Sequence, residues 1–212
     1  MAKPAEQGDV WEWRAFGSPG DDLLGIVESH PVRMGLSRAR EEDLYFIAAT
    51  SNQNIKLRRA GNNWLLKLKL LLETRDAAEV YRETSEMVCG FPIPSSLADE
   101  VASLLETRLP SEEHKRTASL DRDQFVRLMA HAAPVLRLTP VLKTRSQFEF
   151  NEGWVEIANV IFPLLTVQSI SIQSFRFEAL LRIRRELLIG PGSRNASNLT
   201  PMNYVEACRK WG

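Results

Sequence analysis

The clearest pattern in the chain is the strict alternation of aliphatic and cationic residues in two short segments, IKLR at 55–58 and LKLK at 66–69. Side chains on a β-strand point alternately to opposite faces, so this period of two predicts two strands. Between them, GNN at 61–63 is a typical hairpin connection, because Gly and Asn tolerate positive φ. We therefore predict a hairpin with one aliphatic face and one cationic face.

The polar face of this hairpin carries Lys56, Arg58, Lys67 and Lys69. A solvated strand face is the simplest interpretation of either pair alone, because Lys is common at exposed strand positions. The alternation returns in the segment 140–150, and the sequence shows no matching acidic strand opposite these cations. Like charges across a ladder destabilise a sheet, so we expect a polyanion to occupy this face.

Other segments that alternate in the same way, or that are rich in β-forming residues, predict further strands. These segments are 10–16, 43–49, 140–150, 154–162 and 167–174. Within 140–150, Lys143, Arg145 and Glu149 occupy positions that share one face.

Apolar residues spaced by three or four predict helices between the strands. The expected helices are a short one within 21–35, one at 80–90, one capped by Ser96, one at 124–133, one at 177–189, and a last one opened by Thr200-Pro201. This order lacks a regular strand–helix rhythm, which favours an antiparallel α+β architecture. Because one strand face is polar, the sheet is expected to be open or to close around a hydrated lumen.

The amino-acid composition gives no support to several kinds of binding partner. The 212 residues include 27 Lys+Arg and 27 Asp+Glu, so no overall charge draws the chain toward nucleic acid or a membrane. Three His and two Cys at scattered positions give little support to a zinc site or a disulfide framework. The N-terminus has no apolar signal-type segment, and no apolar run is long enough to span a bilayer. We expect a soluble, cytoplasmic protein, and the sequence does not indicate its oligomeric state.

At these segments the sequence resembles the CYTH, or triphosphate tunnel, superfamily, which includes thiamine triphosphatases, inorganic triphosphatases and class IV adenylate cyclases. The similarity lies in DLYF at 43–46, IKLRRAGNNWLLKLK at 55–69, VLKTR at 141–145, WVEIANVIF at 154–162 and the Ser/Gln strand that follows. Each motif is short, but their order over residues 10–190 matches the family. The resemblance implies an α+β fold, namely an antiparallel, closed or nearly closed β-barrel of about eight strands with flanking helices.

The sequence itself predicts a disordered tail at 1–9, and the return of the alternating pattern predicts two related halves near 10–109 and 120–212. The resemblance implies that residues 10–212 form a single tunnel domain. Basic lumen residues would bind a triphosphate, and acidic residues would hold Mg²⁺ or Mn²⁺. Carried over by position, the expected phosphate ligands are Arg14, Lys56, Arg58, Lys67, Lys69, Lys143 and Arg145. The expected metal ligands are Glu12, Glu149 and Glu156.

Several acidic positions of the family are not matched. The first Glu of its Glu-x-Glu-x-Lys signature is Val10 here, and its Lys is Arg14. The Asp of a later strand falls near Asn159, and a late pair of glutamates is replaced within SISIQ at 169–173. Mg²⁺ prefers carboxylate oxygens, so these changes weaken the predicted metal site.

Three functional hypotheses follow. The first is a tunnel that binds a triphosphate, polyphosphate or nucleotide-type polyanion without turnover, and the missing carboxylates favour it. The second is a divalent-metal-dependent triphosphatase, a phosphohydrolase in which water attacks the terminal phosphorus, and the usual activity of the family favours it. Both imply a phosphorylated small-molecule partner. The third, a single-stranded nucleic-acid binder, is disfavoured by the neutral charge and by aromatic residues that do not interleave with the cations.

Overall fold

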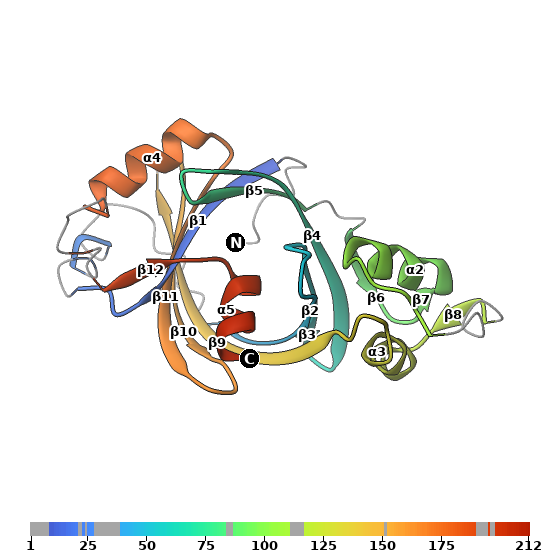
Figure 1. Ribbon diagram of the computed structural model, residues 1–212. Helices are drawn as coiled ribbons and strands as arrows, with labels where there is room; N and C mark the ends of the chain where they lie inside the picture. The colour runs from blue at the N-terminus through green and yellow to red at the C-terminus, as the bar shows by residue number, and fades with distance from the viewer. Residues whose placement is uncertain are drawn as a thin grey trace.

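Eight antiparallel strands form a closed barrel in the computed structural model, which describes residues 9–20, 23, 25–27, 39–83, 87–110, 117–150, 152–189, 195 and 198–212. The strands pair in the order β11-β10-β9-β2-β3-β4-β5-β1, and β1 also pairs with β11 to close the circle (Figure 1). Their bounds are β1 Asp9–Gly17, β2 Ala39–Ile47, β3 Asn54–Ala60, β4 Asn63–Arg75, β5 Ala78–Arg82, β9 Arg137–Phe150, β10 Gly153–Ile161 and β11 Thr166–Ser174. The expected antiparallel barrel with flanking helices is confirmed.

Shorter elements extend this barrel. Additional strands are β6 Val88–Gly90, which pairs with β4, β12 Leu199–Pro201, which pairs with β1, and the pair β7 Ile93–Pro94 and β8 Ser119–Leu120. The helices are α2 Ser95–Leu104, α3 Arg122–Ala130, α4 Phe177–Glu186 and α5 Tyr204–Trp211. Helices α2 and α3 lie on one side of the barrel and α4 on the other, while α5 lies within the ring of strands (Figure 1).

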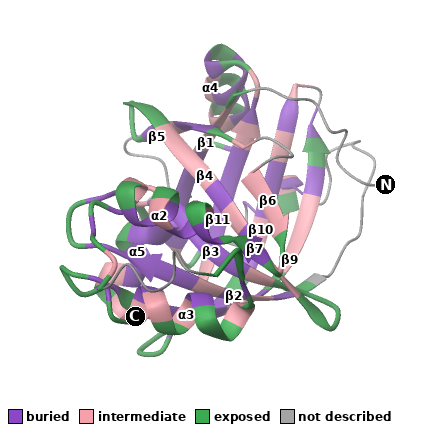
Figure 2. Ribbon diagram, turned by 90° about the vertical axis from the view of Figure 1, so that its right-hand side faces the viewer, coloured by how far each residue is buried: buried purple, intermediate pink, exposed green. Residues whose placement is uncertain are grey.

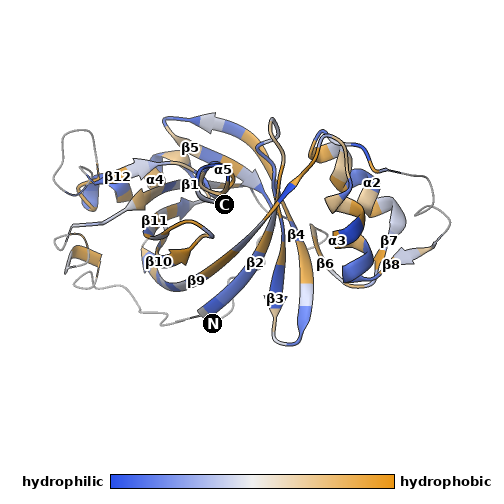
Figure 3. Ribbon diagram, turned by 60° about the horizontal axis from the view of Figure 1, so that its bottom comes forward, coloured by the Kyte–Doolittle hydropathy of each residue, from blue (hydrophilic) through white to orange (hydrophobic). Residues whose placement is uncertain are grey.

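The outer face of the barrel is apolar where helices cover it, as the alternation predicts. Ile55 and Leu57 of β3 are fully buried in one cluster with Val101 of α2 and Phe125 of α3. Hydrophobic and hydrophilic positions alternate along the strands beneath these helices (Figure 3). Burying each large aliphatic side chain stabilises the fold by about 1.5–3 kcal/mol, which fixes the side of the strand that faces outward.

The opposite side of the barrel is covered by α4. Leu180 and Ile183 of this helix pack with Ile170 and Ile172 of β11, and these residues are almost completely buried. The strand centres are buried, whereas hairpin ends and the outer turns of the helices are exposed (Figure 2). Ser169, Ser171 and Gln173, which alternate with these isoleucines, therefore face the interior of the barrel.

A third apolar cluster lies inside the barrel at one end. Phe16 of β1, Tyr45 of β2 and Phe162, which follows β10, pack there with Tyr204 of α5. The Tyr204 ring stacks on Tyr45 with centroids 5.6 Å apart and meets Phe16 edge-on at 5.4 Å. The C-terminal helix thus fills part of the barrel interior. The remaining part of the interior is lined by charged residues and is called the lumen below.

Three local predictions are wrong. The segment predicted as a helix at 80–90 forms β5 and β6, because β5 pairs with both β1 and β4 and this pairing outweighs the helical spacing. Thr200 and Pro201 lie in β12, and α5 is capped instead by Asn203 through a capping box with Glu206. Ser96 lies inside α2 and does not cap it, because the helix begins at Ser95 and its N-cap position is Pro94, which has no side-chain acceptor.

The remaining predicted strands and the helices at 124–133 and 177–189 are confirmed within a few residues. Asp9, expected in the tail, begins β1, whereas residues 1–8 and most of the helix expected within 21–35 lie outside the described residues. Helix α4 ends at Glu186, before the expected end at Gly190-Pro191. The division of the domain into two related halves stays a prediction. None of the helices among the described residues combines the length and apolar character needed to cross a bilayer.

Candidate functional site

Seven cations from four strands face the barrel lumen. The buried aliphatic residues of the outer face fix this orientation, because a one-residue slip in register would exchange the two faces of a strand. The seven are the predicted phosphate ligands: Arg14 on β1, Lys56 and Arg58 on β3, Lys67 and Lys69 on β4, and Lys143 and Arg145 on β9. The fold therefore brings together cations that are dispersed along the chain.

The structure corrects the expectation that no acidic strand faces these cations. Strand β2 lies between β3 and β9, and Asp43 on its inner face is fully buried. The Asp43 carboxylate accepts hydrogen bonds from Arg58 Nε at 2.8 Å and from Arg58 Nη2 at 2.9 Å. It also lies 3.2 Å from Lys56 Nζ and 3.5 Å from Lys143 Nζ.

Glu41, two residues earlier on β2, neutralises the other side of the same group. Its carboxylate lies 3.0 Å from Lys143 Nζ, 2.7 Å from Arg145 Nη2 and 2.9 Å from Arg58 Nη2. The strand predicted from the sequence begins at residue 43 and so omits Glu41. The alternation of Glu41, Asp43 and Tyr45 is the signal that identifies an acidic lumen strand.

Arg14 links a second group of charges across the seam that closes the barrel. It donates to Glu12 at 2.8 Å, to Glu156 of β10 at 3.2 Å and to the Ser169 hydroxyl of β11 at 3.2 Å. Glu156 also accepts a 2.7 Å hydrogen bond from Arg145, which joins this group to the first. Glu156 is therefore a lumen residue that takes part in the ion-pair network.

A third group surrounds the two lysines of β4. Glu83, which follows β5, lies 2.9 Å from Lys67 Nζ and 3.4 Å from Lys69 Nζ. Lys69 Nζ is also 3.6 Å from Glu12. Each of the seven predicted phosphate ligands thus has at least one carboxylate partner from the chain itself.

The ion pairs keep the lumen carboxylates charged. Burial raises the pKa of Asp43, but Lys56, Lys143 and Arg58 outweigh it and hold this pKa well below its usual range. For Glu12, burial is again opposed by Arg14 and Lys69, and the pKa falls to about 2. These carboxylates are therefore ionised in the folded protein at neutral pH.

Lys56 shows the opposite balance. Burial lowers its pKa well below the ordinary value, and nearby Arg58 and Lys143 lower it further, although Asp43 opposes the shift. The Lys56 ammonium donates to the Tyr45 hydroxyl at 3.0 Å. An added anion would therefore favour the charged form of Lys56.

The cations differ in their access to solvent. Arg14, Lys56 and Lys143 are the most buried, with side-chain exposures of 4–5%. The other four are 16–27% exposed, and they are Arg58, Lys67, Lys69 and Arg145. The lumen therefore has an accessible cationic part and an enclosed cationic part.

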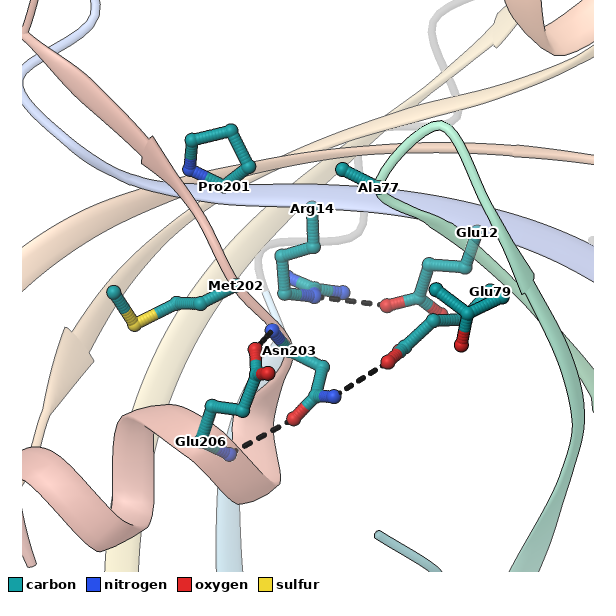
Figure 4. Close-up of a pocket in the computed structure, with 9 residues that line it drawn as sticks. Glu12, Arg14, Ala77, Glu79, Pro201, Met202, Asn203 and Glu206 are labelled. Atoms are coloured by element: carbon teal, nitrogen blue, oxygen red, sulfur yellow. Dashed lines mark hydrogen bonds and ion pairs between the residues drawn. The ribbon is translucent and has the colours of Figure 1, made fainter.

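A cavity of about 130 Å³ adjoins the lumen between β1, the β4–β5 turn, β12 and α5. Figure 4 shows Arg14 and Glu12 on one wall and Asn203, which donates to Glu79 at 2.6 Å, on another. Glu206 on α5 completes the capping box beside them. This cavity reaches the Arg14–Glu12 pair from the side on which α5 lies.

The predicted metal ligands are not gathered into one site. Glu12 and Glu156 both bind Arg14, whereas Glu149 is exposed on β9. Asn159, which corresponds by position to a family Asp, is exposed on the outer face of β10. In the part of the chain that the structure describes, no three His, Cys, Asp or Glu side chains could together hold a metal ion. Glu12 and Glu156 are already committed to cations, so this donor set does not fit Mg²⁺ or Mn²⁺.

No family model and no curated protein sequence matches the chain. Solved structures with a similar fold include a conserved hypothetical protein from Pyrococcus furiosus, with a TM-score of 0.53, 15% identity, and coverage of 93% of this chain and 98% of that one. A putative adenylyl cyclase from Hippeastrum, described as having a dominant triphosphatase activity, has a TM-score of 0.52 and 13% identity, covering 95% of both chains. A putative adenylate cyclase from Bacillus halodurans has a TM-score of 0.50 and 11% identity, covering 92% and 95%. The chain therefore shares the fold of these structures, and the fold that the resemblance implies is confirmed.

Proposed function

We propose that this protein binds a small phosphorylated polyanion, of the triphosphate, polyphosphate or nucleotide type, in the charged lumen and without a requirement for divalent metal. The observation that carries the proposal is the convergence of seven cations from four strands on one lumen. Arg can bind phosphate oxygens through two parallel hydrogen bonds, and Lys neutralises them as a compact charge. A rigid barrel holds these groups in place before the ligand arrives, which lowers the entropic cost of binding.

The ligand would replace ion pairs that already exist within the chain. Lys67 and Lys69 share Glu83, whose side chain is 25% exposed and can turn toward solvent when phosphate oxygens take its place. Arg58 and Arg145 are also partly exposed, so an anion can reach four cations before it meets the enclosed ones. Binding is then an exchange of carboxylate for phosphate, and its affinity depends on how strongly the carboxylates compete.

A metal-dependent triphosphatase is the second candidate. It is supported by the fold likeness to the Hippeastrum protein and by the carboxylates of Glu12 and Glu156 in the lumen. The pairing of both carboxylates with Arg14 argues against it, because a metal would have to displace that guanidinium. Release of phosphate from tripolyphosphate, ATP or thiamine triphosphate that Mn²⁺ stimulates and EDTA abolishes would establish this alternative.

Calorimetric titration with tripolyphosphate in the presence of EDTA tests the binding proposal. We expect measurable binding to the wild-type protein and an affinity about fivefold lower, or weaker still, for Lys69→Ala, which removes a lumen cation. The matched control is Arg59→Ala, because Arg59 lies on β3 beside Arg58 but points outward and is 52% exposed. Equal binding by the wild type and Lys69→Ala, or no binding to either, would contradict the proposal. Tight, steeply salt-dependent binding to long RNA without any response to tripolyphosphate would instead favour a nucleic-acid binder.

A further inference from the structure

Tyr204 carries a buried hydroxyl group in the lumen. The residue lies in the first turn of α5, and it is only 4% exposed. The ring is fixed by stacking on Tyr45 and by an edge contact with Phe16. The hydroxyl oxygen has no hydrogen-bond partner among the residues that the structure describes. An unpaired buried hydroxyl costs free energy, so a partner from outside the chain is expected there.

Ser171 has a second hydroxyl of this kind. It lies on the inner face of β11, where its Cα pairs with Arg14 of β1 on one side and with Glu156 of β10 on the other. Ser169, two residues earlier on the same face, accepts a hydrogen bond from Arg14. The Ser171 side chain is fully buried, and its hydroxyl finds no partner within the described part of the chain.

The three most buried cations surround the Tyr204 ring. The distance from the ring centroid is 4.5 Å to the Arg14 guanidinium carbon, 5.0 Å to Lys143 Nζ and 5.9 Å to Lys56 Nζ. Burial disfavours the charged form of Lys143, yet Tyr204 and the carboxylates of Asp43 and Glu41 raise its pKa above the ordinary value. The cations that contact the Tyr204 ring are thus the three least exposed ones, so Tyr204 lies at the enclosed part of the cationic group.

We propose that Tyr204 and Ser171, together with Arg14 and Lys143, form an anion subsite that takes the terminal phosphoryl group of the bound polyanion. This inference rests on the proposed function, since it assigns one end of that ligand. The partly exposed cations hold the rest of the ligand, and a linear anion that extends inward from them ends at Tyr204. Both hydroxyls can donate to phosphoryl oxygens that Arg14 and Lys143 neutralise. The C-terminal helix is then part of the binding site.

Calorimetric titration with tripolyphosphate tests the subsite in Tyr204→Phe and Ser171→Ala, which remove only the hydroxyl groups. Loss of one hydroxyl donor to a charged acceptor should weaken binding about tenfold in each variant. The matched control is Tyr81→Phe, because the Tyr81 hydroxyl already donates to Glu79 at 2.6 Å. We expect tripolyphosphate affinity to be unchanged in this control.

Cyclic trimetaphosphate, which has three phosphates but no terminal group, provides the second comparison. Its affinity should stay close to the wild-type value in Tyr204→Phe. The melting temperature of the ligand-free variant should equal or exceed that of the wild type, because the hydroxyl has no partner to lose. If wild type and both variants bind tripolyphosphate equally, the hydroxyls meet only water and the subsite is refuted while the proposed function stands. If the wild type itself does not bind tripolyphosphate, the proposed function is refuted, and the subsite that rests on it is refuted as well.

Discussion

Asp43 and Arg58, which lie 15 residues apart on neighbouring strands, form a two-point ion pair inside the barrel with distances of 2.8 and 2.9 Å. Arg58 is one of the cations that the sequence suggests for phosphate, yet its guanidinium is already held by a buried carboxylate. The same holds for the other lumen cations, each of which has a carboxylate partner. The charges of the lumen therefore stabilise the fold and compete with any anionic ligand at the same time.

Asp43→Asn should separate these two effects. It leaves Arg58, Lys56 and Lys143 without their shared buried carboxylate, so the free energy of unfolding should fall by about 3–5 kcal/mol. Tripolyphosphate should raise the melting temperature of this variant more than that of the wild type, because it supplies the missing negative charge. Urea unfolding with and without the ligand measures both effects.

The control for this experiment is Glu42→Gln, which changes the residue before Asp43 on β2. Its carboxylate pairs with Arg59 on the outer face and is 41% exposed. Such an exposed pair contributes about 1 kcal/mol or less, so stability and ligand response should both stay close to wild type. An Asp43→Asn variant as stable as Glu42→Gln would show that the buried network contributes little to folding.

Glu83→Gln should strengthen anion binding at little cost in stability. Glu83 competes for Lys67 and Lys69 but is partly exposed, so the free energy of unfolding should change by about 1 kcal/mol or less. Removing the competing charge should increase the affinity for tripolyphosphate several-fold. Titration calorimetry at constant ionic strength measures the change. Unaltered affinity would place the ligand away from the β4 lysines.

Lys56 should take up a proton when a polyanion binds. Burial lowers its pKa well below the ordinary value in the free protein, and an added anion favours the charged form and raises this pKa. Proton uptake should therefore accompany binding, and affinity should fall as pH rises through the lowered pKa. Titrations in two buffers of different ionisation enthalpy count the protons. The uptake should be smaller in Lys56→Met, and identical proton counts in both proteins would refute the assignment.

Acid should destabilise the fold through the lumen carboxylates. The folded-state pKa of Glu12 is about 2, below its ordinary value of 4.5, so the unfolded chain binds the proton more readily. The stability that Glu12 contributes is complete above about pH 4.5 and is lost as pH falls toward 2. The melting temperature of Glu12→Gln should vary less with pH in this window than that of the wild type. Parallel curves for the two proteins would contradict the prediction.

The alternating segments alone predict much of the barrel. The IKLR and LKLK segments determine the orientation of β3 and β4. Their aliphatic side chains pack beneath the helices on the outer face of the barrel, so Lys56 and Lys67 must face the lumen. Helical spacing is misleading at β5, a strand of five residues paired on both edges, because ladder pairing with distant strands outweighs local spacing. The predicted caps are wrong because the helices begin at other residues: α2 begins one residue before Ser96, and Thr200 pairs with β1 as part of β12.

The sequence by itself determined that the cations of each strand share one face, because the alternation of side chains along a strand is a local property of the backbone. Only the tertiary structure decided that Glu41 and Asp43 meet those cations. It also decided that α5 enters the barrel and brings Tyr204 next to Arg14, Lys56 and Lys143. Each of these depends on the order of strands and on the packing of α5 inside the barrel. The residues that meet in the lumen come from distant parts of the chain. Electrostatic interaction depends on distance in space, so the sequence alone does not show which carboxylate neutralises which cation.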